Sequence, residues 1–599
     1  MSYNVSIEEL DGMKFYDYFM AGASKIIENQ SDLNKINVFP VPDSDTGTNI
    51  ALTMKYVLDN TTPNISFNKT AQLIAENALI GARGNSGVIF AQYLYGLSRE
   101  AGVHHKIGIS HFAQIMKNAV EYVYEAIAKP VEGTIITVIR EWADSLYEAK
   151  EKASNFLHLI SDSYRIAQIS LNETPEKLEV LKKAKVVDAG AKGFVYFLEG
   201  ILDFIKTGKH TEHAQNFKDI VNIEEIGESD FGDLTYRYCT ETMIEGENID
   251  KKAVNERIRN MGDSIVVAGS DKKLRIHIHT NDPPEFFNGI LDFGTLAYQK
   301  VDDMLRQYEI VHKRKSKIAI LTDSACDLPS VLMDNYQINM VPINLYVGLN
   351  HYLDKLSITP ELFYNRLDSV KPYPTTAQPN VKQYAPFYER LAKHYKQIIS
   401  IHLSDKLSGT YANSKKTADM IKENHDVDIT VIDSKTISGA LGLLVLRVAR
   451  AVEDGMSYED IVSNIGEWQN KNRLLVSVKT MKYLVRGGRV SAMKGLVAKI
   501  LNLKPIVSLD EEGKTVVFDK AFSQKGNIKR VFKHVEEINK NSEIWEYCIL
   551  HAHNIDGAVD YANRMEKLLG MKPAYIQDIS TVIGLNAGIG AVAIALMEK

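Results

Sequence analysis

Apolar residues recur at helical spacing through the first third of the chain. Stretches such as FMAGASKIIENQ (residues 19–30) and NKTAQLIAENALIGA (68–82) place them three and four positions apart, which is the pattern of an amphipathic helix. A polar segment, KTGKHTEHAQNF (206–217), interrupts this pattern. We therefore predict an all-α domain, a helical barrel, over residues 1–207.

The pattern changes after this break. LTYRYCTETMI (234–244) and SIVVAGSDKKLRIHIHT (264–280) contain alternating, β-branched runs, and VDDMLRQYEIVHK (301–313) is amphipathic. Strands mixed with helices predict a small α+β domain over residues 208–315, ended by the basic cluster HKRKSK (312–317).

The remaining half alternates short apolar runs with helical segments. KIAILTD, QIISIHL and DITVIDS are the first of these runs, and this alternation is typical of an α/β domain with a largely parallel sheet. We predict such a domain, with two lobes, over residues 316–599. The apolar tract AGIGAVAIALM (587–597) we interpret as a buried helix, because it is too short to cross a bilayer.

Composition excludes several classes. The chain has 599 residues, 45% of them apolar, and a net charge of −6, so its charge gives no reason to expect nucleic acid as a partner. Its three cysteines are far apart in sequence, which favours a reducing compartment over a disulfide framework. The first residues, MSYNVSIEELDGMKFYDYF, have no apolar segment of a leader peptide. We expect a cytoplasmic protein without a membrane-spanning segment.

The most informative stretch is NVFPVPDSDTGTN, residues 37–49. Asp43 and Asp45 lie on a turn stiffened by two prolines, and carboxylates of this kind hold Mg²⁺ together with substrate phosphates. Asn37 offers a neutral oxygen. The polar run that follows begins a helix, where free N–H groups favour an anion. We predict a nucleotide–metal site here; the alternative is an Asx-turn followed by an N-cap.

Three other loops precede helices in the same domain. They are GARGNSG (81–87), PVEGT (130–134) and DAGAKG (188–193). Glycine lets a backbone approach a phosphate closely, so four such loops predict a ring of helix starts around one anionic ligand. The chain has no Walker A motif.

Together the four motifs resemble the ATP-binding L-type domain of dihydroxyacetone kinases and, more closely, the kinase component of bacterial fatty acid kinase. The resemblance implies ATP and Mg²⁺ as cofactors, with Asp43 and Asp45 as the catalytic metal ligands beside Asn37. Ser44 stands where that family usually has glycine. The residues implied to contact the nucleotide are Thr46, Gly47, Thr48, Asn49, Gly84, Asn85, Ser86, Thr134, Asp188 and Gly190.

The middle domain also resembles that kinase, in YRYCTE, GDSIVV and RIHIHTNDP. His277 and His279 are two positions apart on a predicted strand and so share one face, while Cys239 comes from another strand. One cysteine and two histidines are a plausible zinc set with an open fourth position. The alternative is that both histidines face solvent on an edge strand and Cys239 is a core residue.

The last half resembles DegV-type fatty-acid-binding proteins, in ILTDSACDLP, PTTAQPN, SDKLSGTYANS, YLVRGGRVS, LNLKPIV and IGLNAGIGAVAIALM. The resemblance implies that Thr376 and Ser408 hold a fatty acid carboxylate, beside Gly409 and Thr410. Asn586 stands where the family commonly has a histidine, so it brings no titrating charge. NAGIGAVA is not a dinucleotide fingerprint, because it lies at the end of the chain rather than in a first βα turn.

The combined resemblance implies a fatty acid kinase. ATP would phosphorylate a fatty acid bound in the last domain, and the acyl phosphate would feed phospholipid synthesis through an acyltransferase; a homodimer is a further expectation. Two alternatives stay open. One is a lipid-binding or lipid-sensing protein with a degenerate kinase domain, favoured by Ser44 and Asn586, and the other is a kinase for a small polyol such as dihydroxyacetone.

Overall fold

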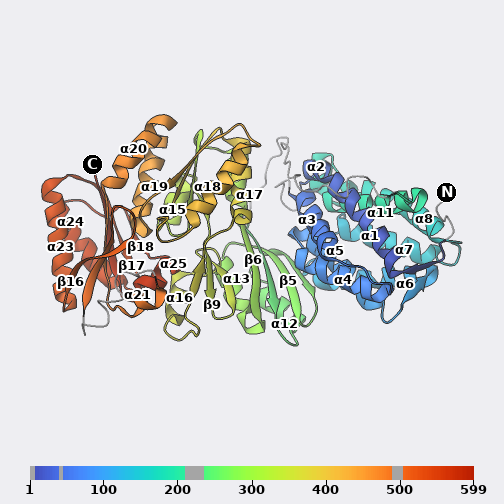
Figure 1. Ribbon diagram of the computed structural model, residues 1–599. Helices are drawn as coiled ribbons and strands as arrows, with labels where there is room; N and C mark the ends of the chain where they lie inside the picture. Colours follow the sequence, from blue (N-terminus) through green and yellow to red (C-terminus); the bar gives the residue numbers. More distant parts are fainter. Residues whose placement is uncertain (1–6, 39–44, 210–234, 489–502) are drawn as a thin grey trace. The chain divides into compact units, whose positions relative to one another are not determined.

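The structure is a computed structural model that describes residues 7–38, 45–209, 235–488 and 503–599 (Figure 1). The chain divides into two compact units. The first comprises Met1–Asp282 and Gly289–Met304, and the second comprises Pro283–Asn288 and Leu305–Lys599. Each unit is described by itself.

The first unit begins with a helical domain, blue to cyan in Figure 1. A two-stranded antiparallel pair, β1 (Glu9–Asp11) and β2 (Lys106–Gly108), accompanies the helices. The helices are α1 (Gly12–Glu28), α2 (Gln30–Lys35), α3 (Thr46–Asn60), α4 (Phe67–Gly81), α5 (Gly84–Glu100), α6 (Ile109–Ala126), α7 (Ile135–Ala149), α8 (Phe156–Asn172), α9 (Thr174–Lys177), α10 (Glu179–Ala184) and α11 (Ala189–Thr207). The predicted all-α domain is thus confirmed.

Aromatic side chains build the centre of this domain. Phe90 of α5 meets Phe194 and Phe197 of α11 edge to face, at ring-centroid distances of 5.7 and 5.0 Å. The offset geometry suits the quadrupoles of the rings. Trp142 of α7 also packs on Phe194, so three of the helices that carry predicted site loops are held in one core.

The middle domain completes the first unit with a four-stranded antiparallel sheet in the order β4-β5-β3-β6. Its elements are β3 (Tyr238–Glu245), α12 (Lys251–Ile258), β4 (Asp263–Gly269), β5 (Lys273–Thr280), the 3₁₀ turn η2 (Leu291–Phe293) and β6 (Thr295–Asp303). The helix α13 (Pro283–Ile290) lies between β5 and η2 in sequence, and its residues Pro283–Asn288 belong to the second unit. Val266 and Ala268 of β4 belong to the same buried core as the helices. The sheet is therefore packed on the helical domain.

The second unit has two lobes. Its first lobe carries a parallel sheet in the order β13-β12-β7-β8 and a small antiparallel sheet, β10-β9-β11. The elements are α14 (Met304–His312), β7 (Ile318–Asp323), α15 (Ser330–Asn335), β8 (Asn339–Val341), β9 (Asn344–Val347), β10 (Asn350–Leu353), α16 (Pro360–Arg366), β11 (Thr375–Ala377), α17 (Val381–His394), β12 (Gln397–His402), α18 (Thr410–Lys422) and β13 (Asp428–Asp433). The helix α19 (Ser438–Glu453) leads to the second lobe and packs mainly on the sheet of that lobe. The predicted parallel sheet is present in the first lobe.

The second lobe differs from the prediction. Its six-stranded sheet, in the order β16-β15-β14-β19-β17-β18, is antiparallel except for the pair β17-β18. The elements are α20 (Tyr458–Asn470), β14 (Asn472–Ser477), α21 (Lys482–Gly487), β15 (Lys504–Leu509), β16 (Thr515–Ala521), α23 (Gln524–Asn541), β17 (Ile544–His551), α24 (Ile555–Leu569), β18 (Ile576–Asp578), α25 (Thr581–Ala587) and β19 (Val592–Glu598).

The prediction of a buried helix in AGIGAVAIALM is wrong. Residues Val592–Glu598 form β19, a central strand whose residues are almost all buried. A strand that is covered on both faces shows no alternation, so its short apolar run has the same periodicity as a buried helical segment. The short length of the run, seven residues, and the glycines before it favour a strand over a helix.

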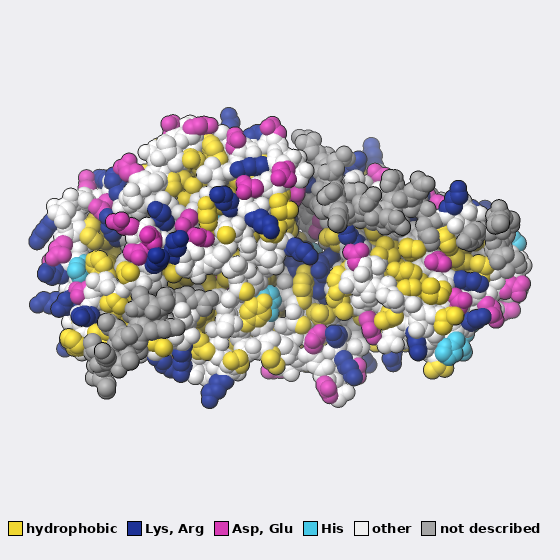
Figure 2. Space-filling model, in the orientation of Figure 1, with side chains coloured by type: hydrophobic (Ala, Val, Ile, Leu, Met, Phe, Trp, Pro, Cys, Tyr) yellow, Lys and Arg dark blue, Asp and Glu magenta, His cyan; other side chains and the backbone are white. Residues whose placement is uncertain are grey.

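The mixture of surface charges agrees with the small net charge of the chain. Figure 2 shows basic and acidic side chains interspersed over the face that it draws. In the part of the chain that the structure describes, no helix combines the length and the apolar content needed to cross a membrane.

Candidate functional site

The start of α3 is built from side chains of the preceding segment. Thr46 donates its hydroxyl to Asn37 Oδ1 at 2.7 Å, and Asn37 is fully buried. Thr48 Oγ1 accepts from Gln30 and from Asn34 at 2.9 and 3.0 Å. These bonds fix the first turn of α3, so Asn37 acts here as the acceptor that orients Thr46.

Glycine is required where α3 touches its neighbours. A Cβ added to Gly47 would lie 2.2 Å from the carbonyl oxygen of Gln30. Gly84, the first residue of α5, has φ +60°, and a Cβ on it would lie 2.5 Å from Asn49 Nδ2. The start of α5 therefore sits directly against the first turn of α3.

The chain of contacts continues to α11 and α7. A Cβ on Gly190 would lie 2.7 Å from Ser86 Oγ, which joins the start of α11 to the first turn of α5. Asp188, the N-cap of α11, accepts from Ala191 N at 2.7 Å and from the main-chain N–H of Ile135, the first residue of α7. The four helix starts are thus connected in the order α3, α5, α11 and α7, and the anionic ligand at their centre stays a prediction.

Thr134 and Asn85 lie in the same cluster. Thr134 is the N-cap of α7, although its hydroxyl donates to the carbonyl of Val131 at 2.8 Å. Asn85 Oδ1 is buried and has no hydrogen-bond partner among the described residues. An unpaired buried acceptor is costly, and at this position it is available to a bound ligand.

The environment of Asp188 shifts its ionisation. Burial raises the pKa of its carboxyl to about 6, although the N–H groups of Ala191, Ile135 and Gly190 act in the opposite direction. Desolvation therefore dominates over the hydrogen bonds that favour the charged form.

Of the two predicted acidic metal ligands, only one can be placed. Asp43 lies outside the described residues, whereas Asp45 directly precedes α3. Burial lowers the pKa of Lys300, but Asp302, Glu241, Cys239 and Asp45 together raise it well above its usual value. Asp45 is therefore within electrostatic reach of the middle-domain sheet. Its carboxylate at a helix start is a donor of the type that Mg²⁺ takes.

The sheet brings the predicted zinc ligands together. Cys239 on β3 pairs with His279 on β5, and His277 follows on the same face. The ligand atoms of these three residues lie within 4.8 Å of one another. Because β5 lies between β4 and β3 and both histidines are buried, the alternative of solvent-facing histidines on an edge strand is wrong.

The three residues fit a metal ion. Neither ring nitrogen of His277 has a hydrogen-bond partner among the described residues, although the ring is buried. Burial lowers the pKa of His277, which favours the neutral imidazole that binds metals. A soft thiolate with two imidazoles suits Zn²⁺.

Two neighbours on this face were not predicted. Glu241 and Arg275, both fully buried, form an ion pair at 2.6 Å. Each stands two positions from a predicted ligand, Glu241 after Cys239 and Arg275 before His277. The period of two along a strand was therefore a signal that could have placed them on the same face.

A cavity between the two lobes of the second unit contains the other predicted site. It encloses about 180 Å³ of space that a water-sized group can enter. Its walls are mostly apolar. The lining residues that were not predicted include Ile343, Leu403, Leu407, Leu474, Val476, Val507 and Val582.

Three of the predicted carboxylate-binding residues line this cavity. They are Thr376, Ser408 and Asn586. Ser408 Oγ lies 2.8 Å from Thr410 Oγ1, and Gly409 N donates to Gln378 at 3.3 Å. Asn586 Oδ1 is buried and has no hydrogen-bond partner among the described residues. Hydroxyl and amide groups thus meet a mostly apolar space, whose lining also includes Gln378, Ser438 and Thr515.

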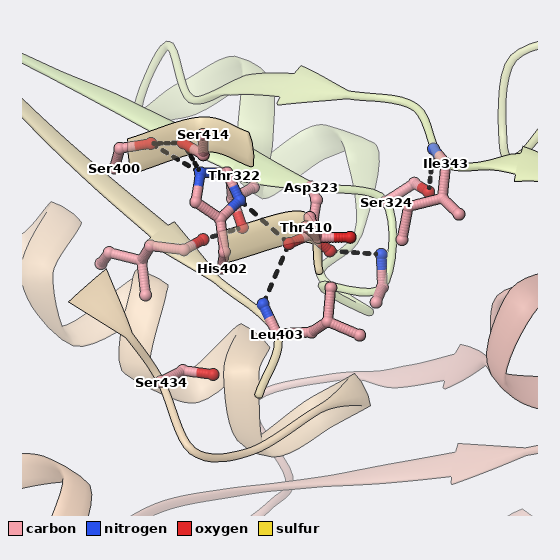
Figure 3. Close-up of polar contacts among 12 residues, drawn as sticks. Thr322, Asp323, Ser324, Ile343, Ser400, His402, Leu403, Thr410, Ser414 and Ser434 are labelled. Atoms are coloured by element: carbon pink, nitrogen blue, oxygen red, sulfur yellow. Dashed lines mark hydrogen bonds and ion pairs between the residues drawn. The ribbon is translucent and has the colours of Figure 1, made fainter. Parts of the chain in front are cut away.

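A buried hydrogen-bond network around His402 lies next to the loop that carries Ser408, and Figure 3 shows this network. His402 lies between Asp323, 3.0 Å from its Nδ1, and the hydroxyls of Ser400 and Ser414, each 2.7 Å from its Nε2. Asp323 also accepts from Leu403 N at 2.9 Å. The arrangement has the residue types of a catalytic triad, but all are fully buried. It holds the start of the loop and α18 in place.

Comparison with protein families assigns the three parts of the chain. Residues 40–203 match the DAK2 domain, residues 235–311 match the FakA-like middle domain of fatty acid kinase, and residues 317–599 match the DegV family, described as uncharacterised. The chain is thus a multi-domain protein whose parts match three different family models. In particular, it carries a DAK2 domain, a FakA-like middle domain and a DegV domain in one polypeptide.

Relatives are similar over part of their length. An uncharacterized protein of Staphylococcus saprophyticus is 35% identical over 321 residues, 52% of this chain and 58% of that protein. The protein YloV of Bacillus subtilis is 33% identical over 337 residues, 53% of this chain and 59% of that protein. The chain thus spans a little over half the length of these curated relatives.

Solved structures of DegV family proteins are similar to about half of the chain. DegV of Bacillus subtilis, described as a fatty acid binding protein, is 27% identical, with 48% of this chain and all of that chain covered and a TM-score of 0.44. A DegV family protein of Thermus thermophilus, described by its fatty acid binding, is 26% identical, with 47% of this chain covered, all of that chain covered and a TM-score of 0.44.

Proposed function

We propose that this chain is an ATP-dependent kinase that phosphorylates the carboxylate of a fatty acid held in its DegV domain. The observation that carries the proposal is the connected cluster of helix starts, in which the first residues of α3, α5, α7 and α11 touch one another through Asn49, Gly84, Ser86, Gly190 and Asp188. Helix dipoles at such starts favour phosphate groups. Several N–H groups of this cluster already have side-chain partners, Gly84 N in Glu241 and both Ala191 N and Ile135 N in Asp188.

The metal part of the proposal uses residues of the same cluster. Asp45, with Asp43 outside the described residues, would hold Mg²⁺ on the phosphates, while Asn37 orients Thr46. Mg²⁺ commonly takes one or two carboxylates and completes its sphere with phosphates and water. When bound, it neutralises charge on the transferred phosphoryl group.

The acceptor part of the proposal uses the cavity between the lobes. Its apolar walls suit an acyl chain, and the hydroxyls of Thr376 and Ser408 are donors for a carboxylate, with the Asn586 amide beside them. Hydrogen bonds to a charged group are the stronger ones. A small polyol does not require a mostly apolar cavity, so the cavity favours a fatty acid over dihydroxyacetone as the substrate.

The reaction needs no general base. A fatty carboxylate is ionised at neutral pH; one of its oxygens attacks the γ-phosphorus of ATP, the bond from that phosphorus to the β,γ-bridging oxygen breaks, and ADP leaves with the electron pair. The products are ADP and an acyl phosphate. Positioning and charge neutralisation are the catalytic contributions, and the acyl phosphate would serve an acyltransferase in phospholipid synthesis.

The test is ADP release by the full chain with Mg²⁺, ATP and oleate, with the acyl phosphate trapped by hydroxylamine as a hydroxamate. We expect oleate-dependent release that is lost in Asp45→Asn and is retained in Asp32→Asn, a change in α2 outside the cluster. Release with dihydroxyacetone but not oleate would favour the polyol kinase, and bound oleate without ADP release would favour the lipid-binding alternative.

A further inference from the structure

Glu241 lies where the middle-domain sheet meets the start of α5. Its Oε1 accepts from Gly84 N at 2.6 Å, and its Oε2 accepts from Arg275 Nη2 at 2.6 Å. The same nitrogen of Arg275 donates to the carbonyl of Ala82 at 2.8 Å. The glycine loop between α4 and α5 is thus held at both of its ends by one ion pair of the sheet.

The ion pair is built to keep this geometry. Glu241 and Arg275 have 0% and 1% of their side chains exposed, and the guanidinium lies 4.3 Å from the ring centroid of Tyr298. Buried, charge-assisted hydrogen bonds are short and directional, and removing one partner leaves a costly unpaired charge. The position of Gly84 therefore depends on the carboxylate of Glu241.

The same carboxylate faces the candidate metal site. Its Oε1 lies 3.6 Å from His277 Nδ1, beyond hydrogen-bond length, and neither ring nitrogen of His277 has a hydrogen-bond partner among the described residues. A histidine that binds a metal through one ring nitrogen commonly donates the other N–H to a carboxylate. Glu241 is the carboxylate within reach for that role.

We propose that Glu241 is a positioning residue that couples metal binding at Cys239, His277 and His279 to nucleotide binding at the start of α5. The nucleotide half of this coupling rests on the proposed function. A bound metal would fix the imidazole and turn its N–H to Oε1, which would add a further hydrogen bond to the carboxylate that already accepts from Gly84 and Arg275. The loop is preorganised before the nucleotide arrives.

Two consequences follow. Preorganisation lowers the ordering cost of the second ligand, so each ligand strengthens the other. Coupling between two sites is reciprocal: the factor by which Zn²⁺ tightens the nucleotide equals the factor by which the nucleotide tightens Zn²⁺, in the usual range of about 5- to 150-fold.

The experiment measures both affinities in the full, metal-free chain. Zn²⁺ is titrated in competition with a chromophoric chelator, with and without saturating Mg²⁺ and adenylyl imidodiphosphate. The analogue is then titrated by calorimetry, with and without Zn²⁺. We expect equal coupling factors from the two titrations.

Three variants separate coupling from stability. Glu241→Gln should weaken Zn²⁺ binding by about 10- to 100-fold and bring the coupling factor close to one. The double variant Glu241→Gln, Arg275→Gln also removes the buried cation that the single change leaves unpaired. It can therefore replace the single variant in the test if the single variant does not fold. Glu245→Gln is the matched control, because Glu245 lies on the same strand in an exposed pair with Lys273.

The outcomes are distinct. Coupling in the parent and in Glu245→Gln, with its loss in the Glu241 variants, supports the proposal. Binding of both ligands with a factor of one in the parent overturns it and leaves the proposed function intact, as does failure of the chain to bind Zn²⁺. Failure to bind the nucleotide at all, with or without Zn²⁺, overturns the proposed function and this proposal together.

Discussion

At the scale of single residues, hydroxyl groups decide what the cavity of the second unit can bind. Ser408 and Thr376 come from a loop and from β11, respectively, and both face the same apolar space. The rest of the lining is mostly apolar, with Gln378, Ser438, Thr515 and Asn586 as further polar residues. A ligand with one charged end and a long apolar body matches this distribution.

We expect Ser408→Ala and Thr376→Ala each to weaken oleate binding. A hydrogen bond to a charged group is worth about 1.5–3 kcal/mol, or roughly ten- to a hundred-fold in affinity. The measurement is a fluorescent fatty acid displacement titration. Thr375→Ala is the control, since Thr375 neighbours Thr376 on β11 but does not line the cavity. Unchanged affinity in both variants would place the carboxylate elsewhere.

A second residue-scale prediction concerns zinc. Cys239→Ser replaces the one soft ligand of the cluster, and a hydroxyl is a poor ligand for Zn²⁺. We expect metal analysis of the purified chain to find close to one Zn²⁺ in the parent and a loss of most of it in the variant. Cys548→Ser, a change at a buried thiol of the second unit, should leave the zinc content unchanged. Equal zinc in parent and both variants would argue against this ligand set.

At the scale of elements, helix starts were more predictable than strand order. Loops with glycine and a polar N-cap were sufficient to predict that α3, α5, α7 and α11 begin where they do. The contacts that join these starts, such as Ser86 against Gly190, depend on packing between distant segments, which periodicity does not record. The sequence pattern did not predict the strand β19 for a related reason, because a central strand shows no alternation of apolar and polar residues.

The start of α5 gives the first prediction at this scale. We expect Gly84→Ala to weaken binding of Mg²⁺ and adenylyl imidodiphosphate at least tenfold, because its φ is +60° and the new Cβ would lie 2.5 Å from Asn49 Nδ2. Gly102→Ala is the matched control: it has φ +54°, but its nearest neighbour atom is at 3.9 Å. It should lose about 1–2 kcal/mol of stability and keep its nucleotide affinity. Similar affinity in both variants would count against a nucleotide site at α5.

The N-cap of α11 gives a prediction about pH. Burial raises the pKa of Asp188 in the folded protein to about 6, above its value in the unfolded chain, so its contribution to stability is fully present below pH 4. It is lost as pH rises through about 6. The asparagine of Asp188→Asn cannot ionise. Between pH 4.5 and 8, the free energy of unfolding of this variant should therefore rise relative to that of the parent by at most about 3 kcal/mol.

Thermal melts at several pH values measure this gap. The N-cap variant Asp250→Asn, at an exposed position on α12, gives the effect of an amide cap without burial. A gap between Asp188→Asn and the parent that stays constant across the pH range would show that desolvation of Asp188 is not a determinant of stability.

At the scale of the whole molecule, the chain joins two kinds of domain that the proposed reaction needs. The DAK2 and middle domains carry the candidate nucleotide and metal sites, and the DegV domain carries the cavity. Covalent linkage raises the effective concentration of one site at the other to the order of millimolar for a short flexible linker. This effect requires that the two sites of one chain can meet, and it has a kinetic consequence.

We expect phosphorylation within one chain, so turnover per chain should not change when the protein is diluted. The sharper test mixes two inactive variants, Asp45→Asn with an intact cavity and the double variant Ser408→Ala, Thr376→Ala with an intact nucleotide site. Their mixture should stay inactive at submicromolar concentration and regain oleate-dependent ADP release only as the concentration rises toward the effective value. Full activity of the dilute mixture would mean instead that the carrier of one chain serves the kinase of another, and the linkage would then have no role in bringing the two substrates together.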